Sequence, residues 1–527
     1  MDLLSLSYIG FVLAALLCYY ALPHIVPRLR RYQWVILLLA SLSFYAWHGG
    51  KSLIFILFTS LSIWLCALRI AALEAQYKEK KRDKSLDRAA KKALKTSVKN
   101  RQRIWLLAGL LSNFGILAWL KYWNVIFHTG IGLLLPLGIS FYTFQSTAYL
   151  IDIYGAKYAP ERSYPHFLLF VSWFPQLLQG PINRFDKMAG SLTAEHRFDA
   201  AEAERACWLI LFGLMKKYAV ADMLSSHISS VFDGTLSDVP GCLIVFTILL
   251  YSVQQYADFS GGIDIVMGVS RLFGVPMMPN FRQPYFSVSL GDFWRRWHIS
   301  LGAWMRDYLF YPFALLKPMQ NFGKWCTHHL GKHFGRVLPA GIANILVFFV
   351  VGIWHGAQLH YVFWGLYNGI VIALSDLTEP FWKSLSKKLH LHTQGRGFHI
   401  FRIVRTFIIV NIGWYFDRIY SAREELTAFA NTIFRFQPAV FGMAFRNKFI
   451  TNGGGTFMAL GSMAVALAGT VFIFMVSLRR ERGTDVEAQV CAQPFWVRGA
   501  AAFIPVMLIL VSFVFVQNAG GFMYANF

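Results

Sequence analysis

Apolar runs long enough to cross a membrane recur along the whole chain. A transmembrane helix needs about 20 apolar residues, and the runs lie at about 3–22, 33–48, 52–73, 104–122, 133–154, 204–226, 241–270, 342–364, 357–376, 400–417, 457–478 and 499–517. Only 15% of the residues are charged, against about 25% in soluble proteins. Because lipid offers backbone groups no hydrogen-bond partners, and because the runs differ from the short alternating segments of membrane β-barrels, we expect an all-α polytopic membrane protein.

Positive charge is concentrated in a few segments of this chain, whose net charge is +23. Residues 75–103 hold much of it. Basic runs also occur in nucleic-acid-binding proteins, but beside transmembrane helices they indicate a cytoplasmic loop facing anionic lipid. Placing residues 28–31 and 479–482 in the cytoplasm as well predicts that both termini are extracytoplasmic. The run Leu3–Leu22 lacks a basic start and a small-residue cleavage site, so we expect a retained helix rather than a signal peptide.

Several apolar segments carry polar residues or helix breakers. The segment 133–154 contains Gln145 within a polar group of side chains, which usually face protein or a cavity at membrane depth. The segment 167–184 is broken by prolines and a glycine, which favours a re-entrant piece or a loop at a helix end. Asp258 and Asp264 lie inside another apolar run, and each needs a partner or an interior position. Arg271 and Arg282 are candidates for that partner, between which the sequence does not decide.

The stretch 286–312 has the greatest polar density in the chain. If it forms a single helix, an apolar face runs along one side, and its members are Phe293, Trp297, Leu301, Trp304 and Tyr308. Arg295 and Arg306 then lie nearly opposite that face, and His298 lies at its edge. Two interpretations remain open, an interfacial anchor helix with snorkelling arginines and a helix that lines a polar cavity.

A second notable histidine, His355, ends a long apolar run just before Gly356. Trp354 and His360 are its neighbours in the sequence. An intramembrane histidine of this kind is more often packed and hydrogen-bonded than catalytic, so position alone does not decide its role. We expect a loop at 317–336 and an interfacial helix at 424–445.

The remaining features define the organisation of the chain. The six cysteines show no metal-ligand spacing, and most lie in apolar runs, so we expect no metal site and no disulfide. The sequence contains no internal repeat and no low-complexity segment. We therefore expect one membrane domain over residues 1–527.

Two motifs resemble the histidine motifs of a known family. FWRRWHISLGAWMRDYL and GIWHGAQLHYVFWGLYNG are similar to those of the membrane-bound O-acyltransferase (MBOAT) family, in its bacterial branch of alginate and peptidoglycan O-acetylation and D-alanyl-lipoteichoic acid transfer. FYTFQSTAYLIDIY, FPQLLQGPINRF and YADFSGGIDIVMGVSRLFG resemble that branch in the same order. The similarity runs from about residue 34 to 370, with weaker similarity in the helices of about 400–527.

The resemblance implies a ring of tilted helices around a central funnel or tunnel, in a bacterial cell membrane. It implies that His355 and His298 correspond to the family's two histidines. The ending that contains Tyr524 resembles an FxYxxF motif whose tyrosine is implicated in carrying the acyl group. It also implies an acyl-CoA or acyl-carrier-protein donor in the cytoplasm, no bound cofactor, and an extracytoplasmic SGNH-type transferase or polysaccharide as partner. One departure is that LFYPFALLKPMQNFGKW replaces a GGNR-like sequence.

The resulting hypothesis is O-acylation of a cell-surface or extracellular polysaccharide. Acyl transfer to a hydroxyl needs a base and stabilisation of an oxyanion, and neutral histidine suits the first task. We expect His355 to be the general base, His298 to orient the reactants or stabilise the oxyanion, and Tyr524 to accept the acyl group. The residues expected to bind substrate are Arg295, Arg306, Gln145, Trp354 and Asp258, although the arginines also suit an anchoring role.

Acetyl is the expected acyl group, and D-alanyl transfer to teichoic acid is the alternative. Two hypotheses of another functional class are a non-catalytic scaffold and a transporter or flippase. In a transporter, Asp258 and Asp264 would mark a substrate path. A transporter built from repeats shows matching halves, which the sequence lacks.

Overall fold

Helices make up nearly all of the structure. The computed structural model describes residues 3–83, 85, 87–127, 135–451, 455–516 and 521–522. Of these described residues 82% are helical, and they form no strand. Their one isolated β-bridge joins Phe281 and Trp297. The all-α prediction is therefore confirmed.

Seven of the described helices are long and apolar enough to cross a membrane, as expected of a polytopic membrane protein. They are α1 (Leu6–Ile25), α3 (Leu53–Lys81), α4 (Arg88–Phe127), α11 (Gly241–Leu272), α16 (Lys332–His355), α22 (Thr456–Glu481) and α24 (Phe495–Phe515). Other predicted spans are helical but are not among these seven, namely α2 (Gln33–His48), α5 (Ile139–Tyr154), α9 (Ala200–Met215), α17 (Leu359–Leu377) and α19 (Arg396–Arg418).

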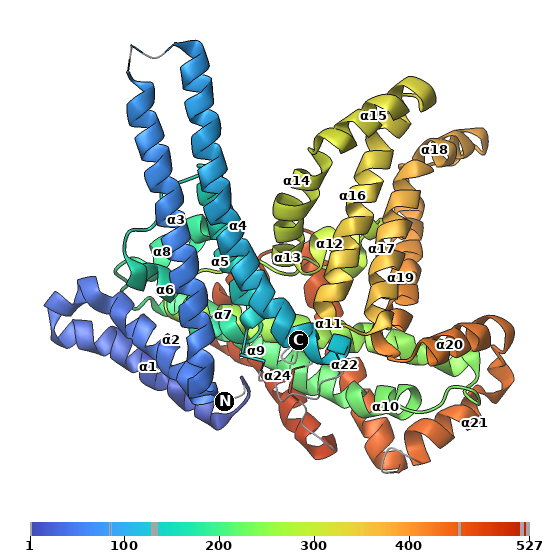
Figure 1. The fold of residues 1–527 in the computed structure, drawn as a ribbon. Coiled ribbons are helices and arrows are strands. Elements are labelled where there is room, and N and C mark those ends of the chain that lie inside the picture. Colours follow the sequence, from blue (N-terminus) through green and yellow to red (C-terminus); the bar gives the residue numbers. More distant parts are fainter. Residues whose placement is uncertain are drawn as a thin grey trace. The chain divides into compact units, whose positions relative to one another are not determined.

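The chain divides into two compact units, and helices α9 and α11 contribute to both. The first unit comprises residues 1–206 and 266–278. Its long helices α3 and α4 run side by side (Figure 1). Helix α5 packs closely against α4 because Gly109 of α4 has no side chain at the point where the Leu150 side chain of α5 approaches it. The remaining elements of this unit are the short helices α6 (Tyr164–Ser172), α7 (Phe174–Gln179) and α8 (Phe185–Thr193), and the 3₁₀ turns Pro27–Tyr32 and Gly50–Ser52.

The polar helix α5 is the buried centre of the first unit. Its hydroxyl and amide side chains are buried from Ser140 to Tyr149, as the sequence predicted for polar residues within an apolar run. The Gln145 amide donates to Gln176 Oε1 of α7 over 2.9 Å. Gly138 interrupts the apolar run 133–154, because α5 begins immediately after this left-handed residue. The predicted break in 167–184 is also present, since α6 ends and α7 begins around Trp173.

The second unit comprises residues 207–265 and 279–527. Its further helices are α10 (Asp222–Phe232), α12 (Leu290–Arg296), α13 (Ile299–Met305), α14 (Tyr311–Ala314), α15 (Lys317–Leu330), α18 (Glu379–Lys388), α20 (Ala422–Phe434), α21 (Phe441–Phe445) and α23 (Val486–Cys491). π-helical turns cover Lys216–Ala221, Arg306–Phe310 and Arg446–Thr451, and 3₁₀ turns cover Pro284–Phe286 and Pro438–Val440.

Helices α16 and α17 form a close antiparallel hairpin in this unit (Figure 1). A methyl group on Gly352 would lie 2.3 Å from the Tyr361 carbonyl oxygen, and one on Gly365 would lie 2.3 Å from that of Phe348. Small residues thus let the two backbones touch, as they do between membrane helices. Helix α19 continues the antiparallel order, since His360 contacts the Phe416 carbonyl and Tyr367 contacts that of Ile409.

Three predicted loops or helices differ from the structure. The prediction that the basic segment 75–103 is a loop is wrong, because α3 runs to Lys81 and α4 begins at Arg88. The prediction of a loop at 317–336 is also wrong, since α15 and the start of α16 occupy this segment. Basic residues are good helix formers, so their charge marks a position beside the membrane rather than a break. The predicted helix 424–445 is two helices, α20 and α21, separated at Pro438.

Candidate active site

The stretch 286–312 is broken at His298, and the prediction of a single helix is wrong. Helix α12 ends at Arg296, and His298 adopts the left-handed conformation with φ 49° before α13 begins at Ile299. This backbone conformation costs energy for a residue other than glycine and is typical of functional sites. The predicted apolar face is nonetheless buried at Phe293, Trp297, Leu301 and Trp304.

Asn280 holds the break in place. Its side-chain Oδ1 accepts hydrogen bonds from the Ser300 amide at 3.1 Å and the Ser300 hydroxyl at 2.8 Å, and its backbone carbonyl accepts from the Ile299 amide. The neighbouring Phe281 pairs with Trp297 on the other side of His298. The first turn of α13 therefore depends on the segment that precedes α12, and together they orient the histidine.

The same oxygen also fixes the tautomer of His298. His298 Nδ1 lies 3.2 Å from Asn280 Oδ1. Because a backbone amide can only donate, the Ser300 contact identifies that atom as the oxygen. Nδ1 must then carry the proton, and Nε2 presents a lone pair. Nε2 is buried and has no hydrogen-bond partner among the described residues.

Burial also keeps this imidazole neutral. His298 is 4% exposed, and burial lowers its pKa to about 3. The Phe259 ring packs against it at 4.9 Å between centroids. His298 is therefore uncharged at neutral pH, with one nitrogen donating to Asn280 and the other able to accept.

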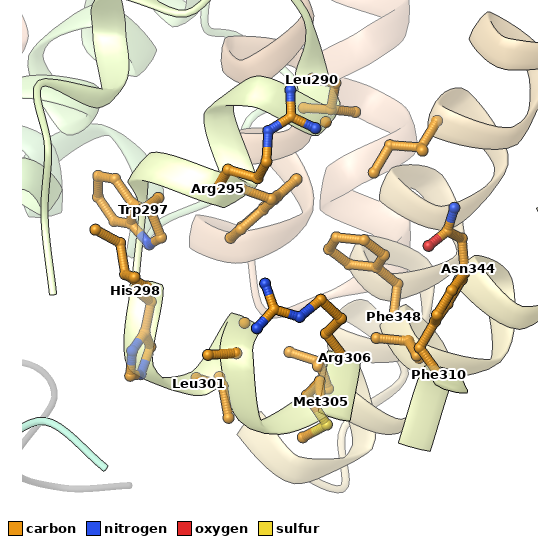
Figure 2. Close-up of a pocket in the computed structure, with 18 of the residues that line it drawn as sticks. Leu290, Arg295, Trp297, His298, Leu301, Met305, Arg306, Phe310, Asn344 and Phe348 are labelled. Atoms are coloured by element: carbon orange, nitrogen blue, oxygen red, sulfur yellow. The ribbon is translucent and has the colours of Figure 1, made fainter. Parts of the chain in front are cut away.

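His355 and His298 line one cavity of about 530 Å³. His355 is the last residue of α16, and the predicted break at Gly356 is confirmed. The cavity walls come from α12, α13, α16 and α17, and they include Leu301, Met305 and Phe348 (Figure 2). Trp354 links the two histidines, with its ring 6.4 Å from that of His298 and 4.9 Å from that of His355. The structure thus brings together two motifs that lie far apart in the sequence.

Two of the predicted substrate-binding arginines line the same cavity. Arg295 and Arg306 have largely exposed side chains, at 70% and 58%. Figure 2 shows the Arg306 side chain extending into the space between His298 and Phe348, while that of Arg295 points away toward Leu290. Each of these two exposed arginines also pairs with a carboxylate, Arg295 with Asp292 at 3.6 Å and Arg306 with Asp307 at 2.9 Å. Arg296 differs in its burial, because it is only 14% exposed and pairs with both Asp292 and Glu481, which indicates a structural role.

Asp258 has a different environment from the one expected. Asp258 pairs with Lys217 at 2.9 Å, and Asp264 pairs with Lys216 at 2.6 Å. The prediction of Arg271 or Arg282 as partners is therefore wrong, and Arg271 instead pairs with Glu202. Lys216 and Lys217 lie in the turn that follows α9, and they neutralise both carboxylates. Unpaired intramembrane carboxylates were the observation that favoured a transport path, so the pairing removes that support.

Lys217 makes further contacts. It also pairs with Asp222 at 2.8 Å and donates to the Gly521 carbonyl at 2.9 Å, and the Phe522 ring lies 4.8 Å from its ammonium. Asp258 is therefore part of a buried ion cluster that does not line the histidine cavity.

Gln145 and Tyr524 are the remaining predicted site residues. Gln145 belongs to the first unit, where it bonds Gln176. Tyr524 lies outside the described residues. The roles of all the predicted site residues stay predictions.

Sequence reasoning missed Asn280, although it begins NFRQPY, the segment directly before the stretch 286–312. It also missed Asn344, which lines the cavity from α16. An asparagine within the apolar run of α16 is a detectable signal, since polar side chains at membrane depth usually face protein or a cavity. The contact between Asn280 and His298 spans 18 residues and needed the structure.

Comparisons with known proteins agree with the predicted family. The sequence matches MBOAT, membrane-bound O-acyltransferase family, over residues 44–323. A probable alginate O-acetylase AlgI of Pseudomonas syringae pv. tomato is 31% identical over 405 residues, which cover 73% of this chain and 67% of the relative. A peptidoglycan O-acetyltransferase of Helicobacter pylori is 30% identical over 79% of this chain and 76% of its own length.

A more distant similarity reaches a third activity. A teichoic acid D-alanyltransferase of Bacillus subtilis is 27% identical over 53% of this chain and 67% of its own length. The names of these relatives describe O-acetylation of alginate and of peptidoglycan and D-alanyl transfer to teichoic acid. The family match covers the stretch in which His298 is found. The chain therefore belongs to the membrane-bound O-acyltransferase family and is a multi-pass membrane O-acyltransferase.

Proposed function

We propose that the protein takes an acetyl group from a cytoplasmic thioester and delivers it across the membrane for O-acetylation of a cell-surface or extracellular polysaccharide. The observation that carries this proposal is the pair of histidines at one cavity, with the tautomer of His298 set by Asn280. The membrane is the bacterial cell membrane, and both termini are extracytoplasmic.

His355 acts as general base in this proposal. It takes the proton from the accepting hydroxyl while the oxygen attacks the thioester carbonyl carbon. The carbon–sulfur bond then breaks, the ester forms, and the proton passes to the leaving thiolate. His298 orients the hydroxyl through its Nε2 lone pair. We prefer this to oxyanion stabilisation because Nε2 carries no proton and Nδ1 is engaged by Asn280.

The donor enters from the cytoplasmic end of the cavity. The lining extends along α17 as far as Asp376, next to α18, whose exposed face carries Lys383, Lys387 and Lys388. The positive-inside rule places α18 in the cytoplasm. Arg295 and Arg306 then serve as contacts for the phosphates of an acyl-CoA or acyl-carrier-protein donor, because guanidinium groups bind phosphate well.

Acetyl is preferred to D-alanyl because the acetylating relatives are more similar to this chain and match more of it. The alginate and peptidoglycan relatives are 31% and 30% identical over at least 73% of the chain, and the D-alanyl relative is 27% identical over 53%. D-alanyl transfer to teichoic acid remains the second candidate. An SGNH-type transferase outside the membrane is the proposed partner, with Tyr524 as the acyl acceptor that serves it.

The test measures polymer-linked ester in cells that express the wild-type protein or His355→Ala at equal levels, with acetate and D-alanine separated by mass. We expect the variant to lose acetate by 10²-fold or more, which is about what a general base contributes. Loss of D-alanine alone would move the protein to the second candidate. Unchanged ester in His355→Ala would overturn the base assignment.

A separate substitution tests the acyl acceptor. Tyr524→Phe removes one oxygen and little else, so it should lower polymer ester strongly while leaving donor binding unchanged. Mass spectrometry of the C-terminal peptide should show an acyl group on wild-type Tyr524 and none on the variant. Full activity of Tyr524→Phe would exclude the shuttle without affecting the histidine assignment.

A further inference from the structure

A second cavity of the same unit lies where α10, α19 and the start of α20 meet. Its volume is about 510 Å³, and none of its lining residues belongs to the histidine cavity. The lining is mixed in chemistry, with an arginine, two carboxylates, three serine hydroxyls, an amide and aromatic rings. No residue predicted from the sequence lies there.

Arg418 is the centre of this cavity. Its side chain is only 7% exposed, and its Nη2 donates to Asp233 at 2.6 Å and to the Ser229 hydroxyl at 3.4 Å. Its Nη1 is buried and has no hydrogen-bond partner among the described residues. A buried guanidinium nitrogen without a partner is costly, so a ligand that accepts a hydrogen bond would satisfy it.

Aromatic rings flank the guanidinium on this cavity. The Tyr420 and Phe232 rings lie 5.4 and 5.7 Å from it. Tyr420 is 62% exposed, which leaves a broad apolar face open to a ligand. Serine hydroxyls at 225, 229 and 421 both donate and accept hydrogen bonds. An apolar face beside a dense set of donors and acceptors matches a pyranose sugar, which has apolar C–H faces and a rim of hydroxyls.

The charge of the lining favours a neutral sugar. Asp233 and Glu424 contribute two carboxylates against the single charge of Arg418. An anionic ligand would meet net negative charge, whereas sugar hydroxyls can donate to the carboxylates and accept from Arg418 Nη1.

The cavity also lies at the same end of the helices as His355. Tyr420 packs 5.4 Å from the His360 ring, His360 packs 3.9 Å from Tyr361, and Tyr361 packs 5.9 Å from His355. One layer of rings therefore links the two cavities. Helix α19 runs from the basic end near α18 to Arg418 at the opposite end, which the proposed orientation places toward the extracytoplasmic side.

We propose that the Arg418–Tyr420 cavity is a binding site for a neutral pyranose unit of the acceptor polysaccharide. This inference rests on the proposed function for the identity of the ligand as acceptor, but sugar binding itself needs no acyl donor. The two proposals therefore fail separately.

The test uses the full chain in lipid nanodiscs without donor, and isothermal titration with two probes, an N-acetylglucosamine tetrasaccharide and a mannuronate tetrasaccharide. We expect the neutral probe to bind more tightly. Tyr420→Ala should weaken its binding by roughly tenfold, and Arg418→Lys by roughly tenfold or more, since it keeps the ion pair with Asp233 but removes the second donor. Phe434→Ala is the matched control, because this ring of α20 is 82% exposed and does not line the cavity.

Each outcome decides the proposal. The proposal would be overturned if the wild-type protein did not bind the neutral probe, or if it bound the mannuronate more tightly. It would also be overturned if Tyr420→Ala and Arg418→Lys bound the neutral probe as tightly as the wild type. His355→Ala should bind the neutral probe as the wild type does, so lost acylation with retained sugar binding would separate this site from the chemistry. In an acylation assay that includes the proposed extracytoplasmic partner, Tyr420→Ala should raise the KM for the neutral polysaccharide and leave kcat nearly unchanged.

Discussion

The ion cluster and the histidine cavity are two buried polar regions of the second unit that differ in whether their polar atoms have partners. In the ion cluster, Lys216 and Lys217 each have a carboxylate within 2.9 Å, and both lysine side chains are 2% exposed. In the histidine cavity, the His298 ring is buried to a similar degree, yet its Nε2 has no partner among the described residues. A buried charge with its partner stabilises a packing arrangement, whereas a buried lone pair without one is available to a substrate.

This contrast separates residues that looked alike in the sequence. Asp258 and His298 are both polar residues in apolar surroundings, and both were expected at the substrate site. The contacts assign Asp258 to the ion cluster and leave His298 at the cavity. Substitutions in the first region should therefore lower stability, and those in the second should lower activity.

The largest effect is expected in the ion cluster. Lys217→Met leaves Asp258 and Asp222 buried without their cation, and breaking such a pair costs about 3–5 kcal/mol. Thermal unfolding of the purified protein in detergent should show a large fall in Tm. Further replacement of both aspartates by asparagine should recover part of it.

The matched control for that experiment is Lys383→Met. Lys383 also forms an ion pair, with Glu379, but its side chain is 69% exposed. Such surface pairs contribute about 0–1 kcal/mol. A Lys217→Met protein as stable as this control would show that the ion cluster does not hold the unit together.

A smaller effect, on activity, is expected from Asn280. Asn280→Leu removes the acceptor that fixes the His298 tautomer, and we expect acyl transfer to fall by about 100-fold, at the lower end of the contribution of acid–base groups. Asn280→Asp keeps an acceptor oxygen but adds a negative charge that raises the pKa of His298. Its activity should recover in part, with the acidic limb of the pH profile moved to higher pH.

A purely structural role for Asn280 would give another result. The two variants would then differ in amount of folded protein, while the pH profile of each would match that of the wild type. Unfolding in detergent at pH 7 should accompany the assay for both proteins.

The smallest of the three effects is the pH dependence of stability that comes from His298. Its pKa in the folded protein is about 3, below the unfolded value of about 6.5, so the unfolded chain binds more protons between these values. Stability from this group therefore rises with pH through that window. At pH 5 the wild type should have lost about 2 kcal/mol relative to pH 7, while His298→Gln should lack this loss.

Comparison of the two unfolding curves from pH 4 to 7 checks this sign, because the other titrating groups are common to both proteins. Parallel curves would mean that His298 is solvated or paired when folded. The contrast with the ion cluster would then no longer hold.

Much of the fold was predictable because the length of an apolar run and the position of helix-breaking residues are local properties of the sequence. The spans at α1, α3 and α11, the start of α5 after Gly138 and the end of α16 at His355 all follow from them. The basic segment 75–103 and the segment 317–336 were not predictable as helices from charge alone, since charge indicates solvation rather than backbone conformation. The predicted single domain and the ring around a funnel stay predictions.

The site was predictable only as a set of residues. The two histidine motifs were found in the sequence, and the structure places His298 and His355 at one cavity. Neither the break at His298 nor the partner of Asp258 followed from periodicity, because both depend on contacts between distant segments, with Asn280 and Lys217. Helical spacing assumes an unbroken helix, and a single left-handed residue removes that assumption.

The backbone contact between α16 and α17 has a consequence for how this enzyme changes over evolution. Because Gly352 and Gly365 bring the two helices into direct contact, neither helix can shift along the other to resize the cavity. The opposite wall consists of two short helices joined through Trp297 and His298, and Leu301 and Met305 lie on it. Selection for a longer or shorter acyl group is therefore expected to act on Leu301 and Met305 and to leave both glycines unchanged.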